Sequence, residues 1–285
     1  MQKYDYIING SGASGLMLAY RMAKDSFFDT ASILIIDKEK KTSNDRTWCF
    51  WENGKGEWDD LVYKSWSKIL FESYSYKNTI PLQSYTYKMI RSSKFYKKLW
   101  SFIETKKNIS FIKTTVLSVT DTLDGAFVET SIGRYHSEKL LNSIDFDQNF
   151  THQEEYPVLL QHFTGWFIET KKNHFDDSVA TFMDFTVDQK TNTRFMYVLP
   201  VSANKALFEY TLFSKDVLTT KEYERELQKY LELKSITDYT IIEKEKGVIP
   251  MTSFKFWQEN SKNILNIGTV GGWTKASTGY TFKNT

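Results

Sequence analysis

The order of hydrophobic and polar positions at the amino-terminal end predicts a strand, a helix and a second strand. Tyr6–Ile8 is a short apolar run, and residues 16–22 read as a helix that packs on one apolar face. Ile33–Ile36 is a second apolar run of strand length. Because two parallel strands are joined by a crossover helix, this pattern predicts the start of a parallel sheet.

The next hundred residues predict one helix among several short strands. Phe95, Leu99 and Phe102 recur at spacings of four and three, which is typical of a helix with one apolar face, expected over residues 94–105. Short runs of strand length occupy residues 68–90 and 140–144, and residues 109–119 and 125–135 read as the two strands of a hairpin. Residues 38–66 carry no clear period and are expected to be irregular.

The sequence pattern changes near Gln153, after which apolar runs of strand length follow one another at regular spacing. They cover residues 158–168, 180–187, 194–199 and 205–213. This spacing predicts one antiparallel sheet, which can be solvated on one face and buried on the other. Thr219 and Glu222 form a capping box before an amphipathic helix, and residues 241–251 read as the last strand of the region.

A glycine-rich turn follows the first predicted strand at once. Residues 10–15 read GSGASG, with the spacing G-x-G-x-x-G, and Asp37 ends the second strand. Gly10 permits the tight turn, Gly12 lets a pyrophosphate approach the backbone, and Gly15 lets helix and strand pack closely. Asp37 is placed to accept hydrogen bonds from ribose hydroxyls. The pattern therefore predicts dinucleotide binding, and the alternative is a glycine-rich turn in an ordinary βαβ unit.

A second group of glycines follows the apolar strand predicted at residues 263–267. Gly268, Gly271, Gly272 and Gly279 lie close together with Ser and Thr residues, which reads as another helix entrance. We expect this strand to return to the first domain. Since the chain ends at Thr285, we also expect either a shortened chain or a frayed final turn.

Composition narrows the class of protein. The chain has 285 residues, 41% of them hydrophobic, and a net charge of +2, so no nucleic-acid partner is indicated. The single cysteine, Cys49, excludes an internal disulfide framework and suits a reducing cytoplasm. No apolar run approaches the roughly 20 residues needed to span a bilayer, and no secretory leader is evident. The four histidines have no metal-ligand spacing, so no metal is expected.

Aromatic residues gather in the block DRTWCFW at residues 45–51. A surface loop seldom carries so many rings, so this segment either packs inward or lines a site. Arg46 in the same block is either a surface ion-pairing residue or a ligand for a phosphate or ribityl oxygen.

Glu209 is the acid that the strand pattern singles out. Leu207, Glu209 and Thr211 alternate with Phe208 and Tyr210, so the carboxyl lies on one face of a predicted strand. The pattern leaves two interpretations open, a solvated sheet face or a buried acid with a chemical role.

Several stretches together resemble the flavin-dependent lycopene cyclases. They are residues 10–15, DRTWCFW at 45–51, FMDFTVDQ at 182–189, RFMYVLP at 194–200, LFEYT at 207–211, GVIPM at 247–251 and IGTVGGWTKASTGYTF at 267–282. The resemblance runs over nearly the whole chain in the family's order. Family members usually continue beyond the last motif with a further helical segment, and residues 140–147 keep little of the usual flavoprotein strand signature.

The resemblance implies an α/β fold, with a Rossmann-like, three-layer FAD-binding domain of the glutathione-reductase type and an inserted antiparallel-sheet substrate domain. The corresponding domains are residues 1–150 for FAD, 151–245 for substrate and 246–285 for the return to the FAD domain. The implied cofactor-binding residues are Gly10, Gly12, Ala13, Ser14, Gly15, Asp37, Lys38, Arg46, Arg91, Gly268, Gly271, Gly272 and Gly279.

The resemblance also implies a lycopene β-cyclase, which closes β-rings on linear carotene ends without net redox change. Glu209 would be the acid that protonates the polyene, with a pKa raised by burial, and reduced flavin and nearby rings would stabilise the carbocation. Asp184 is a second carboxylate candidate, catalytic or structural, and the alternative is an acid on the surface at the end of a strand. NAD(P)H would keep FAD reduced, and the lipid-soluble substrate would place the enzyme at the inner face of the membrane, in the cytoplasm. The rival interpretations are a related FAD-dependent hydroxylase or prenyl reductase, and an inactive flavin-binding fragment.

Overall fold

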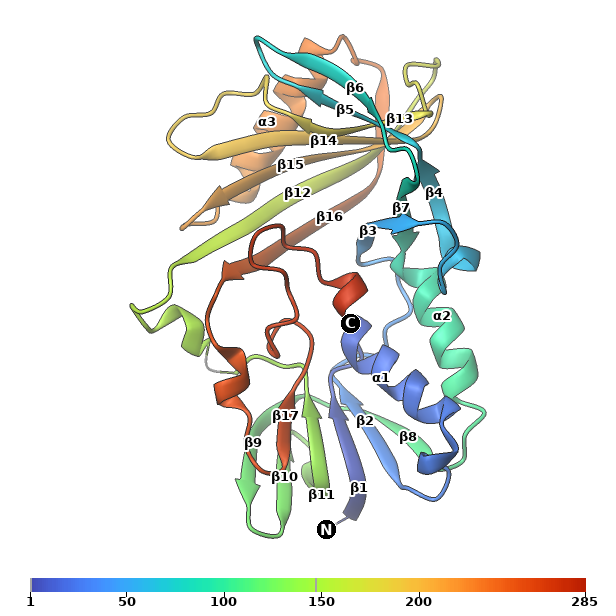
Figure 1. Ribbon diagram of the computed structural model, residues 1–285, viewed down its shortest axis with the longest axis vertical. Coiled ribbons are helices and arrows are strands. Elements are labelled where there is room, and N and C mark those ends of the chain that lie inside the picture. The colour runs from blue at the N-terminus through green and yellow to red at the C-terminus, as the bar shows by residue number, and fades with distance from the viewer. Residues whose placement is uncertain (1, 147) are drawn as a thin grey trace. The chain divides into compact units, whose positions relative to one another are not determined.

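The computed structural model describes residues 2–146 and 148–285, and the chain divides into two compact units (Figure 1). Unit 1 comprises Met1–Asn44, Ser92–Val158 and Thr252–Thr285, and unit 2 comprises Asp45–Arg91 and Leu159–Met251. The ranges expected from the sequence place residues 45–91 in the first domain, whereas these residues belong to unit 2.

Unit 1 is built on a seven-stranded sheet whose centre is parallel (Figure 1). The strand order is β8 (Ile109–Lys113), β2 (Ile33–Asp37), β1 (Gln2–Asn9), β11 (Gly133–Asn142), β10 (Gly125–Thr130) and β9 (Val116–Thr122), and β17 (Ile264–Asn266) also pairs with β11. All five residues of β2 are buried, as expected for a strand covered on both faces. The predicted strand at 109–119 is in fact two strands, β8 and β9, that lie at opposite ends of the sheet order.

Two helices of unit 1 pack against each other. They are α1 (Ala13–Lys24) and α2 (Ser92–Ile103), and the rings of Tyr20 and Phe102 meet edge to face at 5.2 Å. Phe95 and Leu99 of α2 are fully buried, which confirms its predicted apolar face. No helix among the described residues is long and apolar enough to cross a bilayer.

Unit 2 contains a second seven-stranded sheet, which is mostly antiparallel (Figure 1). Its order is β16 (Tyr239–Thr252), β12 (Val158–Thr170), β15 (Lys205–Ser214), β14 (Thr193–Ser202), β13 (Val179–Asp184), β5 (Lys68–Glu72) and β6 (Lys77–Pro81). The antiparallel arrangement of β12, β15, β14 and β13 confirms the sheet predicted from the spacing of these four strands.

Helix α3 (Thr220–Leu233) covers one face of this sheet with a large apolar cluster. The cluster joins Tyr223, Leu227 and Tyr230 of the helix to Phe208 and Tyr210 of β15. The predicted capping box is present, since the backbone N–H and hydroxyl of Thr219 both donate to a Glu222 carboxylate oxygen at 2.8 Å.

The remaining strands of unit 2 form a three-stranded sheet in the order β3 (Thr47–Asn53), β7 (Tyr85–Arg91) and β4 (Val62–Trp66). The irregular structure expected for residues 38–66 is therefore wrong for β3 and β4. Aromatic and apolar side chains occupy both faces of β3, so the strand shows no alternation of polar and apolar residues. Single 3-10 turns complete the elements, at Ser26–Phe28, Asp59–Leu61, Asn149–Thr151, Phe256–Glu259 and Phe282–Asn284. The last of them is the only helical turn found after the C-terminal glycines, where a helix entrance was expected.

A buried histidine links the sheet of unit 2 to α3. Nδ1 of His162 forms a hydrogen bond with the Tyr223 hydroxyl, and Nε2 lies 2.6 Å from Oγ of Ser214. Burial, assisted by the nearby charge of Arg194, lowers the pKa of His162 below its usual value of 6.5. The folded state therefore binds the proton of this histidine less readily than the unfolded chain does.

We expect acid to destabilise the protein through His162. Its contribution to stability is complete above the unfolded pKa of about 6.5 and is lost as the pH falls below it, by at most about 1.4 kcal/mol per pH unit. Urea unfolding between pH 7.5 and 5.5 measures the slope, which His162→Asn should reduce. The same substitution at the exposed His152 serves as the control, and an equal loss of slope in both variants would contradict the assignment.

Candidate functional site

The glycine-rich loop of unit 1 has the geometry of a phosphate-binding turn. Gly10 has φ +92°, a conformation that favours glycine, and a Cβ on Gly15 would lie 1.9 Å from the carbonyl oxygen of Gly10. Gly12 caps α1 without a side-chain hydrogen bond, and a Cβ there would meet no atom within 4 Å. The loop thus packs tightly at Gly15 and leaves open space at Gly12, beside the first N–H groups of α1 and near Ala13.

Asp37 ends β2 beside this loop and is largely buried. One of its carboxylate oxygens accepts hydrogen bonds from the backbone N–H of Ser11 at 2.6 Å and from its hydroxyl at 2.9 Å. Lys38 is exposed. At the end of β1, both polar side-chain atoms of Asn9 are buried without a hydrogen-bond partner in the described chain. The amide of Asn9 therefore offers hydrogen-bonding atoms to a ligand at this site. The sequence pattern did not single out Asn9.

The second glycine group meets the first at one point. Gly268 has φ +65°, and a Cβ on it would lie 2.2 Å from Oγ of Ser14, in the first turn of α1. A Cβ on Gly271 would lie 2.4 Å from the carbonyl oxygen of Asn266, while Gly272 and Gly279 have φ of +75° and +71°. The structure thus brings residues from both ends of the chain together at the start of α1, as the predicted return of the strand requires.

Glu209 lies in unit 2 on the face of β15 opposite to α3. Its neighbours in the sheet are Gly165 of β12 and Tyr197 of β14, and it accepts a hydrogen bond from the Thr211 hydroxyl at 2.9 Å. The side chain is half-buried. Of the two interpretations that the sequence left open, the structure is closer to the buried acid than to an open, solvated face.

A second carboxyl, which the sequence did not single out, lies next to this position. Glu245 of β16 is buried, and its Oε2 accepts a hydrogen bond from the Thr47 hydroxyl at 2.7 Å. A Cβ on Gly165 would lie 3.1 Å from Cγ of Glu245, so the glycine leaves the space that this side chain fills. Glu209 and Glu245 thus flank Gly165 on the same face of the sheet.

Burial raises the pKa of both carboxyls, and the charge of Glu245 adds to the rise at Glu209. The pKa of Glu209 is raised to about 8, chiefly by burial and then by the charge of Glu245. The pKa of Glu245 is raised to about 7 by burial, against the opposing effects of the Thr47 hydroxyl and Arg91. Burial together with both carboxylates also raises the pKa of Cys49. At neutral pH this face of the sheet therefore holds a protonated Glu209.

Aromatic rings form a connected group beside Glu209, and one of them belongs to its sheet neighbour Tyr197. The Trp51 and Phe182 rings meet at 5.2 Å between centroids, and the Phe182 and Tyr197 rings meet at 5.7 Å. Tyr87 joins both Trp51, at 4.7 Å, and Phe182, at 5.7 Å. Because the faces of such rings carry negative charge density, this group is suited to an apolar ligand on which positive charge develops.

The two candidate arginines lie on unit 2, where the charges of both lower the pKa of Glu245. Arg46 is exposed and donates to the carbonyl oxygen of Asp45 at 2.7 Å. Arg91 pairs with Glu243 at 2.5 Å and stacks 3.9 Å from the centroid of the Phe167 ring. Both arginines belong to unit 2, whereas the glycine-rich loop belongs to unit 1.

Asp184 is fully buried on the α3 side of the sheet, away from Glu209. Its carboxylate accepts hydrogen bonds from the Tyr230 hydroxyl and the Thr186 hydroxyl, both at 2.6 Å, and pairs with Lys234 at 3.0 Å. Although burial raises the pKa of Asp184, these donors outweigh it, so its pKa is held below the usual range. Such an ionised and fully bonded carboxylate suits the structural alternative.

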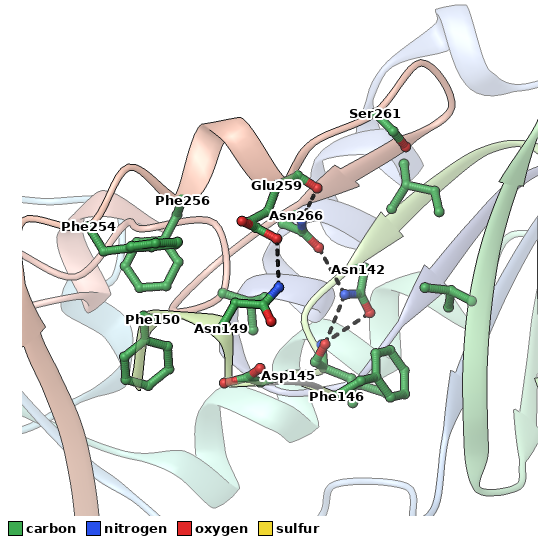
Figure 2. A pocket seen from close by; sticks show the side chains of 14 residues that line it. Asn142, Asp145, Phe146, Asn149, Phe150, Phe254, Phe256, Glu259, Ser261 and Asn266 are labelled. Carbon is green, nitrogen blue, oxygen red and sulfur yellow. Dashed lines mark hydrogen bonds between the residues drawn. The ribbon is translucent and has the colours of Figure 1, made fainter. Parts of the chain in front are cut away.

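Unit 1 also has a cavity of about 160 Å³, shown in Figure 2. Phe150, Phe254 and Phe256 lie on one side of it, and Asn142 and Asn266 hydrogen-bond to each other at 2.9 Å on the other side (Figure 2). None of the residues predicted from the sequence as site residues lines this cavity.

Solved structures of other proteins share the fold of this chain. A geranylgeranyl bacteriochlorophyll reductase-like protein from Thermoplasma acidophilum superposes with a TM-score of 0.71 at 13% identity, over 100% of this chain and 75% of its own. A flavin-dependent brominase, Bmp2, gives 0.61 at 12% identity, over 94% and 72% of the two chains. A flavoprotein/dehydrogenase from Cytophaga hutchinsonii gives 0.62 at 12%, over 99% and 75%. A comparison with curated protein sequences gives no significant match.

The fold and the glycine-rich loop thus define a mixed α/β protein with a Rossmann-like domain of the FAD-binding type, as predicted. The family model described as "Lycopene cyclase protein" matches residues 5–285. The chain therefore belongs to the lycopene cyclase family, which confirms the resemblance found in its motifs.

Proposed function

We propose that this protein is a lycopene β-cyclase that closes β-rings on the ends of a linear carotene. The observation that carries the proposal is the carboxyl of Glu209, which has a pKa of about 8 on an aromatic-lined face of unit 2. A carboxyl that stays protonated at neutral pH is the group needed to donate a proton to an uncharged polyene.

The reaction would begin when Glu209 donates its proton to the terminal double bond. A tertiary carbocation forms, the ring closes on it, and loss of a neighbouring proton restores a double bond, so no electrons are gained or lost. The rings of Trp51, Tyr87 and Phe182 would exclude water and stabilise the positive charge through their faces. Asp184 would support this face from the α3 side as a structural carboxylate.

The cofactor of the proposal is FAD in its reduced form, and the loop of unit 1 fits it. Open space at Gly12 would admit a pyrophosphate to the amino terminus of α1, and Asp37 would receive ribose hydroxyls. The buried, unpaired amide of Asn9 is a further group that a polar ligand would satisfy. When bound, reduced flavin would supply an electron-rich ring that stabilises positive charge. The proposed ligands of FAD also include Lys38, Arg46, Arg91 and the C-terminal glycines.

Three further elements of the proposal follow from the substrate and the cofactor. A linear carotene dissolves only in lipid, so the enzyme would work peripherally, at the cytoplasmic face of the membrane. NAD(P)H would serve as the reductant that keeps the flavin reduced. Because ring closure leaves the substrate's mass unchanged, this reductant would not be consumed in proportion to product.

Incubation of the purified protein with FAD, NAD(P)H and lycopene in lipid vesicles, without oxygen and in a parallel reaction in air, tests the proposal. Without oxygen, we expect a cyclic product of unchanged mass, with far less than one NAD(P)H oxidised per ring. A product that gains hydrogen without oxygen, with one NAD(P)H consumed per turnover, would instead indicate a prenyl reductase, and a product that gains oxygen in air would indicate a hydroxylase. Recovery of unreacted lycopene, with flavin bound, would indicate an inactive flavin-binding protein.

A further inference from the structure

Glu209 and Glu245 form a pair across a strand that has no side chain at the point between them. Gly165 is the register partner of Glu209, and a Cβ on it would come within 3.1 Å of Cγ and 3.5 Å of Oε1 of Glu245. Facing residues on neighbouring antiparallel strands have their side chains about 5 Å apart. The missing side chain at position 165 therefore lets two carboxyls approach each other over the backbone of β12.

Two hydroxyl hydrogen bonds and a small set of titratable groups surround the two carboxyls. Thr47 holds Glu245 through a hydroxyl hydrogen bond, and Thr211 holds Glu209 in the same way. Among the described residues, no lysine, arginine or histidine forms a salt bridge with either carboxyl, so neither is neutralised directly. The titratable and charged groups that face the pair from the surrounding strands are Arg46 and Cys49 of the β3 segment, Tyr87 and Arg91 of β7, Tyr197 of β14 and Glu243 of β16.

We propose that Glu245 is a positioning residue that holds the reactive proton on Glu209, so that the two carboxyls together bind a single proton at neutral pH. This inference rests on the proposed cyclase function. Two carboxylates at close range cannot both be ionised cheaply, and the proton that they share belongs to the pair. Thr47 favours the ionised form of Glu245, which leaves the proton on Glu209.

The two carboxyls also account for both proton transfers of the reaction. When Glu209 transfers its proton to the polyene carbon, two neighbouring carboxylates remain, and their repulsion makes the pair a strong base. The C–H bond next to the cation then breaks, its electrons form the new double bond, and its proton returns to the pair. One proton leaves and one returns in each ring closure, so the site is restored without an external acid.

The experiment is an infrared titration of the purified protein, which needs no substrate. A protonated-carboxyl band that is absent in Glu209→Gln reports Glu209, and its midpoint in the unsubstituted protein should lie near 8. In Glu245→Gln the midpoint should move to lower pH by about one unit, the size typical of interacting carboxyls. Glu232→Gln removes a charge from the exposed side of α3 and should leave the midpoint in place. An unmoved midpoint in Glu245→Gln would overturn the inference.

A second readout uses Cys49, the chain's single cysteine. Because both carboxylates raise its pKa, Glu245→Gln should speed the reaction of this thiol with iodoacetamide at alkaline pH. If Glu245→Gln does not fold, Glu245→Asp keeps the charge on a shorter stem and should give an intermediate midpoint. Where ring closure is measurable, the alkaline limb of its pH profile should move in the same direction as the midpoint.

The two proposals fail separately. A midpoint that moves in Glu245→Gln, in a protein that forms no cyclic product, would leave the carboxyl pair standing and remove the cyclase. Cyclic product from a protein whose midpoint does not move would keep the cyclase and remove the pair.

Discussion

Replacing Glu209 with glutamine is expected to slow ring closure by about 10²- to 10⁴-fold, the range typical of a lost general acid. Glutamine has nearly the same shape, and it can still accept the hydrogen bond from Thr211, but it cannot donate an acidic proton. Chromatographic measurement of cyclic carotene over time gives the rate. Flavin content and thermal unfolding, measured in parallel, should be unchanged, because the substitution leaves the packing of β15 intact.

The matched control is Glu232→Gln, which removes one carboxylate from the exposed side of α3. Its rate should equal that of the unsubstituted protein. A Glu209→Gln protein that keeps more than about a tenth of the activity would contradict the assignment of the acid.

Two alanine substitutions in the glycine-rich loop should have different effects. In Gly12→Ala the new Cβ meets no protein atom and φ is −72°, so the fold should be kept, while the methyl group occupies the space proposed for the pyrophosphate. We expect flavin affinity to fall by at least about tenfold, which corresponds to about 1.4 kcal/mol, with little change in the unfolding temperature.

In Gly15→Ala the new Cβ would lie 1.9 Å from a backbone oxygen, so the turn itself must move. We expect this variant to lose both flavin binding and stability. Flavin absorbance after purification and thermal unfolding, measured on both proteins, separate the two effects. Normal flavin content in Gly12→Ala would contradict the proposed path of the pyrophosphate.

Much of the fold follows from local pattern in the chain. The first strand, α1, β2 and the glycine-rich turn are consecutive, so their apolar spacing already defines a parallel unit. The four strands between residues 158 and 214 have regular lengths and turns, which identify an antiparallel sheet. Helix α3 begins at a capping box, which four consecutive residues of the sequence are enough to identify.

Other features depend on contacts that no local pattern contains. Strand β3 has rings on both faces, so its period is hidden, and its place beside β7 is set by residues about forty positions away. For the same reason the sequence assigned residues 45–91 to the first domain. The pairing of β5 with β13, more than one hundred residues apart, places that segment in unit 2.

The candidate site likewise contains residues that the sequence pattern identified and residues that it did not. Strand alternation put Glu209 on one face but did not say whether that face was solvated, because the answer lies in burial by other strands and in the charge of Glu245 on β16. Gly165 and Glu245 had no signal of their own, since a glycine in a strand becomes informative only when its register partner is known. Asp184 belongs to a motif like Glu209, yet only the register shows that it faces α3.

The central claim, that a protein carboxyl gives its proton to the polyene, is tested most directly by ring closure in D2O. The purified protein, reduced FAD and lycopene are incubated without oxygen, and the product is analysed by mass spectrometry. We expect one deuterium in the product for each ring closed, because the proton that returns to the carboxyl pair exchanges with solvent between turnovers. Cyclic product without deuterium would contradict this claim.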